Sequence, residues 1–194
     1  MFKKVVIIGC GLIGCSIAGA AKQKKLAKEI IGIEINNLDD VQNSNFFDSV
    51  KQSILEVNNA DLVILSTPLA SLKDVFYDLI YQHNLKKFDL ITDVFSTKRS
   101  LIDIIQKLDS DKKNVFRKAF LSSHPLAGSE KIGAVAADIS MFENTKVLIC
   151  PFIDSEKFTD VQNREKKEDQ QQKFVTLALF WRSLGGIPKS FPLQ

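Results

Sequence analysis

The sequence has few residues of the kinds that build metal centres or disulfide frameworks. Among its 194 residues are three cysteines, two histidines and one tryptophan. Two of the cysteines lie in one glycine-rich segment, and the three form neither an even disulfide framework nor zinc-type CxxC pairs. Unpaired cysteines of this kind are typical of a reducing compartment, so we expect a cytoplasmic protein without a metal site.

A strong charge bias is also lacking. The formal net charge is +3, and the lysines that produce it are scattered along the chain. Because nucleic-acid surfaces usually concentrate Lys and Arg in one stripe, nucleic acid is not expected as a partner. With 45% hydrophobic and 25% charged residues, the composition is that of a folded globular domain.

The longest apolar run lies near the amino terminus, where two lysines precede VVIIGCGLIGCSIAGAA. This order of residues mimics a secretory signal peptide. Glycines at positions 9, 11 and 14 interrupt the run, which is also short for a membrane span. We therefore favour a folded segment over a targeting signal, and expect no membrane partner.

Short runs rich in Val and Ile alternate with segments of helical periodicity, which is typical of βαβ units around a parallel sheet. The pattern predicts strands over residues 5–8, 30–35, 62–66, 89–94, 116–122, 145–151 and 187–191. It predicts helices over residues 12–25, 71–82, 97–108 and 174–186. We expect a doubly wound, mostly parallel α/β sheet with helices on both faces.

Two polar features are interpreted as structural. Residues 154–173 are almost entirely charged or polar, and we interpret them as a solvated helix or a charged insertion. His83 lies near the end of a predicted helix, where an imidazolium interacts favourably with the helix dipole. His83 is therefore interpreted as structural, and the role of residues 154–173 stays open.

A GxGxxG motif follows the first predicted strand and opens the first predicted helix, the context that separates a dinucleotide fingerprint from a chance match. Gly9 permits the tight turn, Gly11 lets the backbone approach a pyrophosphate, and Gly14 allows close packing of helix on strand. The helix start at Leu12 and Ile13 offers free N–H groups and a positive dipole end to the phosphates. A Rossmann-type nucleotide-binding domain over residues 1–194 is therefore expected.

The cofactor expected at this motif is NAD. Glu34 ends the second predicted strand, where a carboxylate can accept both ribose hydroxyls and would repel a 2′-phosphate. None of the four residues after Glu34 is Arg or Lys, which would be needed to receive that phosphate. Thr67 and Pro68 follow the next strand and are expected at the same carboxyl edge, where such sheets hold ligands.

Two further motifs fall on the same predicted edge. DVFSTKRSL, residues 93–101, places Ser96 and Lys98 at a strand-to-helix junction. Taken alone, these two residues have the types of an ordinary N-cap and an ordinary first-turn lysine.

The second of these motifs, SSHPLAGSEKIG, spans residues 122–133 and contains His124 between a serine pair and a turn. Pro125 favours an extended conformation at His124, and Gly128 lets the chain turn away. We therefore expect the imidazole at a strand end that faces the cofactor.

GCGLIG, DVFSTK and HPLAGSEKIG, in this order, resemble the prephenate and arogenate dehydrogenases of tyrosine biosynthesis. The resemblance runs from residue 1 to about residue 192, and the HPLAGSEKIG segment is its most specific part. It implies an NAD-dependent oxidative decarboxylation of prephenate to 4-hydroxyphenylpyruvate, or of arogenate to tyrosine.

The resemblance also implies roles for individual residues. His124 would take the proton of the ring hydroxyl, and Ser96 would hydrogen-bond the same hydroxyl; an imidazole suits this proton transfer near neutral pH. Lys98, Ser129 and Glu130 are expected in the substrate pocket. Phe95 stands where many members of the family have glycine, so we expect it to narrow the pocket near the nicotinamide.

Members of the family continue into a helical domain that dimerises, and the resemblance places this domain after residue 194. It implies a homodimer for a full-length member and an isolated nucleotide-binding domain here. Two alternatives stay open at this point: an NAD-binding module without turnover, and a hydroxyisobutyrate-type dehydrogenase, which would use a catalytic lysine on a later helix.

Overall fold

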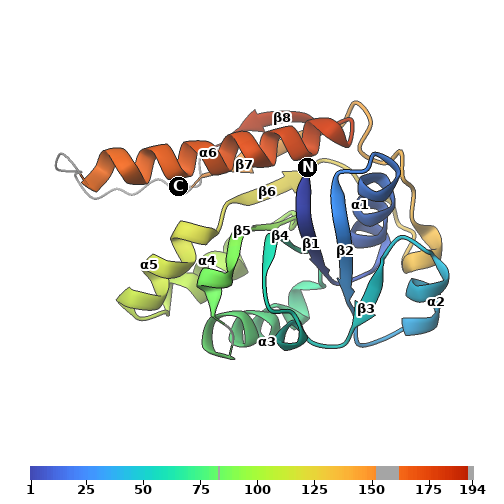
Figure 1. Cartoon of the computed structure of the whole chain (residues 1–194), viewed down its shortest axis with the longest axis horizontal. Coiled ribbons are helices and arrows are strands. Elements are labelled where there is room, and N and C mark those ends of the chain that lie inside the picture. Colours follow the sequence, from blue (N-terminus) through green and yellow to red (C-terminus); the bar gives the residue numbers. More distant parts are fainter. Residues whose placement is uncertain (83, 152–161, 192–194) are drawn as a thin grey trace.

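Five parallel strands form the main sheet of the computed structural model, which describes residues 1–82, 84–151 and 162–191 (Figure 1). They are β1 (Phe2–Ile8), β2 (Ala27–Ile33), β3 (Ser49–Lys51), β4 (Ala60–Leu65) and β5 (Phe88–Asp93). Their order is β3-β2-β1-β4-β5, so the chain reverses its direction of winding between β1 and β4. Sheets of this kind bind ligands at the carboxyl end of such a switch point.

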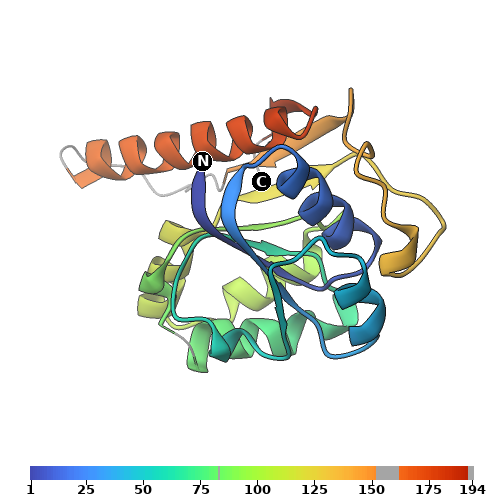
Figure 2. The same cartoon turned by 45° about the vertical axis from the view of Figure 1, so that its right-hand side comes forward.

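Helices cover both faces of the main sheet (Figure 2). One core cluster includes α1 (Leu12–Gln23) and α6 (Gln162–Ser183). The other includes α3 (Leu72–Tyr77), α4 (Arg99–Gln106) and α5 (Ser110–Ala119), while the short α2 (Leu38–Asn43) connects β2 to β3. Alternate side chains of each central strand point to the two clusters, which explains the Val- and Ile-rich runs. The doubly wound Rossmann-type architecture is thus confirmed.

A second, smaller sheet carries the last three strands. It consists of β6 (Ser122–Pro125), β7 (Lys146–Cys150) and β8 (Ile187–Ser190), with β6 antiparallel and β8 parallel to β7. A single parallel bridge joins the two sheets, between Ile91 of β5 and Phe120, which lies just before β6. Helix α6 lies along this sheet in both views (Figures 1 and 2). The arrangement holds β6 beside the carboxyl end of β5.

The strand predicted over residues 116–122 is wrong. Helix α5 continues through Ala119, and β6 begins only at Ser122. The Asp109 side chain caps α5 by accepting a hydrogen bond from the Lys112 amide at 2.9 Å. Phe116 and Phe120 are four residues apart and stack with ring centroids at 4.7 Å. The apolar residues of this segment therefore follow the spacing of a helix, not of a strand.

Several other boundaries shift by a few residues. The second strand ends at Ile33, so Glu34 is the first residue beyond it. Helix α4 begins at Arg99, which makes Lys98 and not Ser96 the N-cap residue. Residues 162–173 of the charged segment are helical, as part of α6. The rest of that segment, and His83, lie outside the described residues.

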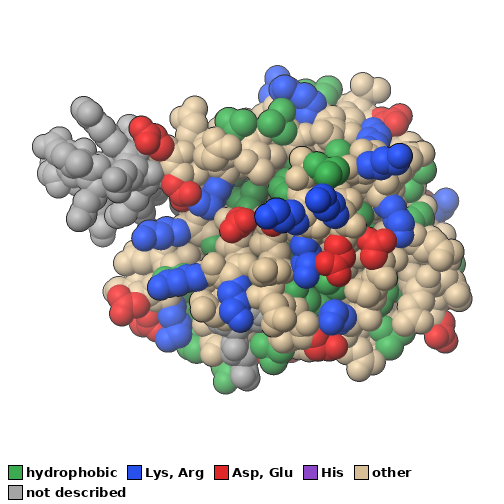
Figure 3. All heavy atoms as spheres, in the orientation of Figure 1, with side chains coloured by type: hydrophobic (Ala, Val, Ile, Leu, Met, Phe, Trp, Pro, Cys, Tyr) green, Lys and Arg blue, Asp and Glu red, His purple; other side chains and the backbone are tan. Residues whose placement is uncertain are grey.

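The surface shows charges of both signs side by side. On the face shown in Figure 3, Lys and Arg side chains are interspersed with Asp and Glu and do not gather in one patch. Within the described ranges, no helix has the length and apolar character needed to cross a membrane.

Candidate functional site

The glycine turn lies between the carboxyl ends of β1 and β4. Gly9 has a φ of 91°, and a Cβ built there would lie 2.7 Å from the amide nitrogen of Thr67. A Cβ on Gly14 would lie 2.1 Å from the carbonyl oxygen of Gly9. A Cβ on Gly11, in contrast, would meet nothing within 4 Å. The fold itself requires Gly9 and Gly14, whereas Gly11 borders open space.

That open space lies at the start of α1. Gly11 is the N-cap residue, and it has no side chain that could cap the first N–H groups of the helix, at Leu12 and Ile13. Uncapped N–H groups at a helix N-terminus bind phosphate well, because they donate hydrogen bonds and carry the positive end of the helix dipole. The turn therefore fits the pyrophosphate of a dinucleotide.

Thr67 provides a second sign of a ligand site at the switch point. Its Oγ1 is buried and has no hydrogen-bond partner among the described residues. A buried hydroxyl without a partner costs free energy, which a bound ligand would recover. Pro68 follows it as an exposed residue.

Glu34 reaches from the end of β2 to the glycine turn. One carboxylate oxygen, Oε2, accepts a hydrogen bond from the Cys10 amide at 2.9 Å. The other, Oε1, accepts from the amides of Ile35 at 2.9 Å and Asn36 at 3.0 Å. The carboxylate is thus fixed beside the turn. In nucleotide-binding domains of this architecture, an acidic residue after the second strand hydrogen-bonds the ribose.

The cysteine thiols of this region are not suited to nucleophilic chemistry. Burial raises the pKa of Cys15 to about 12 and raises the pKa of Cys10 as well. Since the thiolate is the reactive form, both side chains act as small packing residues.

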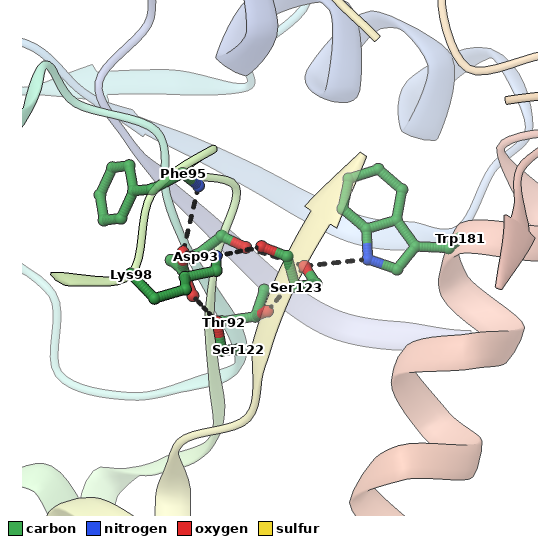
Figure 4. Close-up of polar contacts among 7 residues, drawn as sticks. All are labelled: Thr92, Asp93, Phe95, Lys98, Ser122, Ser123 and Trp181. Atoms are coloured by element: carbon green, nitrogen blue, oxygen red, sulfur yellow. Dashed lines mark hydrogen bonds and ion pairs between the residues drawn. The ribbon is translucent and has the colours of Figure 1, made fainter. Parts of the chain in front are cut away.

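Asp93, the last residue of β5, is fully buried and organises the other half of the site (Figure 4). Its carboxylate accepts hydrogen bonds from the Ser122 hydroxyl at 2.6 Å and the Phe95 amide at 3.1 Å, and it pairs with the Lys98 ammonium. Burial raises the pKa of Asp93, and the Lys98 cation opposes this rise. Lys98 Nζ also donates to the Ser123 carbonyl at 2.7 Å.

A chain of hydroxyl groups continues from Asp93 to α6. The Ser123 hydroxyl donates to the Asp93 carbonyl at 2.8 Å, and it accepts from the Trp181 indole N–H at 3.3 Å. It also lies 3.0 Å from the Thr92 hydroxyl. Because the Ser123 proton goes to a carbonyl, which can only accept, Thr92 is the donor in this pair. These bonds tie β5, β6 and α6 together (Figure 4).

His124 lies in β6, where its extended backbone pairs with Leu148 of β7. The side chain is half-buried, and its Nδ1 is buried without a hydrogen-bond partner in the described part of the chain. Burial lowers the pKa of His124 and the Lys98 cation lowers it further, while the Val94 carbonyl and the Asp93 carboxylate act in the opposite direction. Near neutral pH the imidazole is uncharged, which is the form that accepts a proton.

The remaining site residues predicted from the sequence lie at the surface. Ser96, Ser129 and Glu130 are exposed, and no hydrogen bond joins Ser96 to His124, although the structure describes both. Ser129 accepts a hydrogen bond from the Lys131 amide at 3.2 Å, within the loop after β6. Phe95, which was expected to narrow the pocket, is instead 6% exposed and packed in the core cluster of α3, α4 and α5.

A comparison of the sequence with protein-family models identifies the family. The family model for the nucleotide-binding domain of prephenate dehydrogenase matches residues 17–171, the greater part of the chain. The chain belongs to this family. The matched region includes Glu34, Asp93 and His124, while the glycine turn lies just before it.

Two curated relatives are prephenate dehydrogenases. The prephenate dehydrogenase of Lactococcus lactis is 36% identical over 143 residues, which cover 73% of this chain and 39% of the relative. The prephenate dehydrogenase of Bacillus subtilis is 32% identical over 180 residues, which cover 90% of this chain and 46% of the relative. The chain thus spans less than half the length of these two relatives.

A solved structure shows the same fold. The prephenate dehydrogenase of Aquifex aeolicus, in complex with hydroxyphenyl propionate and NAD+, superposes with a TM-score of 0.72 at 24% sequence identity. The superposition covers 99% of this chain and 60% of that chain.

Several residues of the site were not found from the sequence. Asp93 had a signal, because it is a carboxylate at the end of an otherwise apolar strand. The Ser122–Ser123 pair had a weaker one, its position next to His124. Trp181 had none, since only the folded chain brings α6 to β6.

Proposed function

We propose that the protein binds NAD at the carboxyl edge of the main sheet and catalyses the oxidative decarboxylation of prephenate or arogenate. The observation that carries this proposal is the placement of His124: a half-buried imidazole, held beside the end of β5, whose buried Nδ1 has no hydrogen-bond partner among the described residues. Burial lowers the pKa of His124, which favours the uncharged form. Family membership supports the choice of reaction.

The choice of NAD rests on Glu34. Its carboxylate is fixed beside the glycine turn, where it would accept ribose hydroxyls and repel the 2′-phosphate of NADP. The relative from Aquifex aeolicus was solved with NAD+, which supports the same cofactor here.

Bound NAD would supply the hydride acceptor for the ring carbon that bears the hydroxyl. In the proposed reaction His124 takes the hydroxyl proton as that oxygen becomes a carbonyl. Carbon dioxide then leaves with its bonding electrons remaining in the ring, and His124 returns the proton to the phenolate oxygen that results. Ser96 is our candidate for the hydrogen bond to the same oxygen, and Ser129 and Glu130 for the pocket wall.

A second candidate function is an NAD-binding module without turnover. The exposure of Ser96, Ser129 and Glu130 favours it, because a substrate pocket needs groups that enclose most of the ligand. The surface around these residues gives the substrate little enclosure in this chain alone.

NADH formation by the purified chain separates the two candidates. The chain is given NAD with prephenate and, in a second reaction, NAD with arogenate; NADP replaces NAD as the control. We expect turnover with NAD and little with NADP. Binding of NAD without turnover on either substrate favours the silent module, and failure to bind NAD would overturn both.

The homodimer is also a proposal. Leu126, Ile132 and Val135 follow β6 and are 51%, 86% and 83% exposed, which leaves apolar surface that association between copies would cover. Light scattering on the purified chain tests this: a monodisperse monomer counts against association. We also propose a cytoplasmic location, as the unpaired cysteines indicate, and cell fractionation tests it.

A further inference from the structure

Lys98 was expected to contact the substrate, but protein groups already hold its ammonium. Nζ donates to the Asp93 carboxylate and to the Ser123 carbonyl, and the side chain is only 12% exposed. A lysine ammonium has three donors, so at least two are committed within the protein. Its cation is therefore directed inward, between β5 and β6.

The contacts of this ion pair converge on the residues that carry His124. Asp93 accepts from the Ser122 hydroxyl, while Lys98 donates to the Ser123 carbonyl, and these two serines directly precede His124 in β6. A second bond from Ser123 reaches the Asp93 carbonyl at 2.8 Å. Strands β5 and β6 belong to different sheets, and the backbone joins them just before β6, through the Ile91–Phe120 bridge. Within β6 itself, these side-chain contacts tie the strand to β5.

We propose that Asp93 and Lys98 are positioning residues: as a buried ion pair they fix β6 against β5 and hold the His124 imidazole beside the Lys98 cation. The proposal deepens the proposed function and rests on it, since His124 matters as the base of that reaction. Lys98 then acts through His124 and makes no substrate contact.

The two charges act on the imidazole with opposite signs. The Lys98 cation disfavours a second positive charge on His124, and the Asp93 carboxylate favours it, with Lys98 the stronger of the two. Among the described residues, no other charge contributes to the pKa of His124. The charged residue of β7, Lys146, is exposed at the start of that strand. Strand β7 places Leu148 opposite His124 and carries Cys150, whose thiol stays neutral because burial raises its pKa. Helix α6 contributes Trp181, which does not titrate.

A pH titration by NMR reads this arrangement directly. His83 and His124 are the only two histidines in the sequence, so their imidazole signals can be assigned with one His→Asn variant. Lys98→Met removes the cation and should raise the titration midpoint of His124. Asp93→Asn removes the carboxylate and should lower that midpoint. The double variant should lie between the unmodified chain and Lys98→Met, and His83 serves as the internal reference.

Two results would overturn the proposal. In one, the His124 midpoint of both single variants equals that of the unmodified chain. In the other, both single variants shift the midpoint in the same direction. A single variant leaves a buried charge without its partner and can fail to fold. The double variant, which leaves neither charge, then decides: its His124 midpoint must lie above that of the unmodified chain, and an unchanged or lower midpoint contradicts the proposal.

Turnover measurements distinguish positioning from substrate contact. For a positioning residue, Lys98→Met lowers kcat at neutral pH with little change in KM, and raising the pH restores part of kcat. A raised KM with an unchanged His124 midpoint is the result of a substrate contact and overturns the proposal. If the midpoints shift as expected but His124→Asn retains turnover, the ion pair stands and the proposed function fails.

Discussion

The glycine turn and the His124 strand lie at the same edge of the fold, but they are built from different parts of the chain. At the turn, backbone atoms decide the geometry: a Cβ on Gly9 or Gly14 would collide with backbone, and Glu34 is fixed by three amides. At the strand, side chains decide it, because Asp93 and Lys98 join β5 to β6 through buried polar bonds.

The difference predicts different responses to substitution. At the glycine turn, substitution of Gly9 or Gly14 adds a side chain that collides with backbone atoms, so the damage is steric. A buried ion pair is disturbed by removing a charge, which leaves the partner unpaired and alters the protonation of neighbouring groups. Binding of nucleotide should therefore depend on the turn, and proton transfer on the strand.

The largest effect should come from His124→Asn. Asparagine keeps a polar group of similar shape but cannot accept the proton, so kcat should fall by about 10²- to 10⁴-fold while the affinity for NAD stays unchanged. Calorimetry with NAD and an NADH-formation assay give the two readouts. His83→Asn is the matched control. If NAD affinity in His124→Asn fell as strongly as kcat, nucleotide binding and proton transfer would not be separate functions of the two halves.

The pH profile of the unmodified chain sharpens the same point. Burial and Lys98 lower the pKa of His124, so the imidazole stays uncharged down to a lower pH than an ordinary histidine. Turnover should be constant at neutral pH and decline as the pH falls through this lowered pKa, where the base becomes protonated. A decline whose midpoint lies above the ordinary histidine pKa of about 6.5 would contradict this assignment.

Two glycine variants should separate fold from binding. Gly14→Ala places a Cβ 2.1 Å from the Gly9 carbonyl oxygen, so it should cost about 1–3 kcal/mol of stability or more and abolish NAD binding. Gly11→Ala meets no protein atom within 4 Å, so stability should change by less than about 1 kcal/mol. The affinity of Gly11→Ala for NAD should still fall at least about tenfold, because the methyl group occupies the pyrophosphate space. Thermal unfolding and calorimetry with NAD measure both quantities, and retained affinity in Gly11→Ala would refute the proposed cradle.

Glu34→Gln should have a smaller effect. It keeps the shape of the side chain but replaces charge-assisted hydrogen bonds to the ribose by neutral ones, so NAD affinity should fall about tenfold. The preference for NAD over NADP should narrow as well. Glu29→Gln, near the amino end of β2, removes a partly exposed pair with Lys4 and is the control. Equal effects of the two substitutions would exclude Glu34 as the ribose reader.

The smallest effect is expected from Thr67→Val. Its hydroxyl has no partner within the described residues, so the variant should be as stable as the unmodified chain or more stable by up to about 1 kcal/mol. Its affinity for NAD should fall a few-fold. Thr145→Val is the contrast, since that hydroxyl donates to the Met141 carbonyl at 3.2 Å and its loss should reduce stability. Destabilisation by Thr67→Val would show that its hydroxyl has a structural partner.

The sequence was sufficient for the doubly wound sheet and for the nucleotide half of the edge. Val- and Ile-rich runs report strands buried on both faces, and Gly9, Gly14 and Glu34 act within short segments whose spacing is visible in one dimension. The sequence was insufficient where distant segments meet. The Asp93–Ser122 bond joins residues 29 positions apart, and the Ser123–Trp181 bond joins residues 58 positions apart. Periodicity shows which residues are buried, but not which buried polar groups become partners.

The strand prediction over residues 116–122 was wrong for a related reason. Phe116 and Phe120 are apolar and lie close together in sequence, which fits a short strand as well as one helical face. The cap at Asp109 and the packing of both rings in the core favour the helix. Such a choice depends on what the segment packs against, which the sequence alone does not state.

The most direct test of the central claim, that the turn and the strand form one site, is an NMR titration of the chain with NAD. The account predicts that NAD shifts the imidazole signals of His124, that AMP, which lacks the nicotinamide half, leaves them in place, and that the signals of His83 do not respond. Saturation with NAD that leaves the His124 signals unchanged would contradict the account, since the two halves would then not share a ligand.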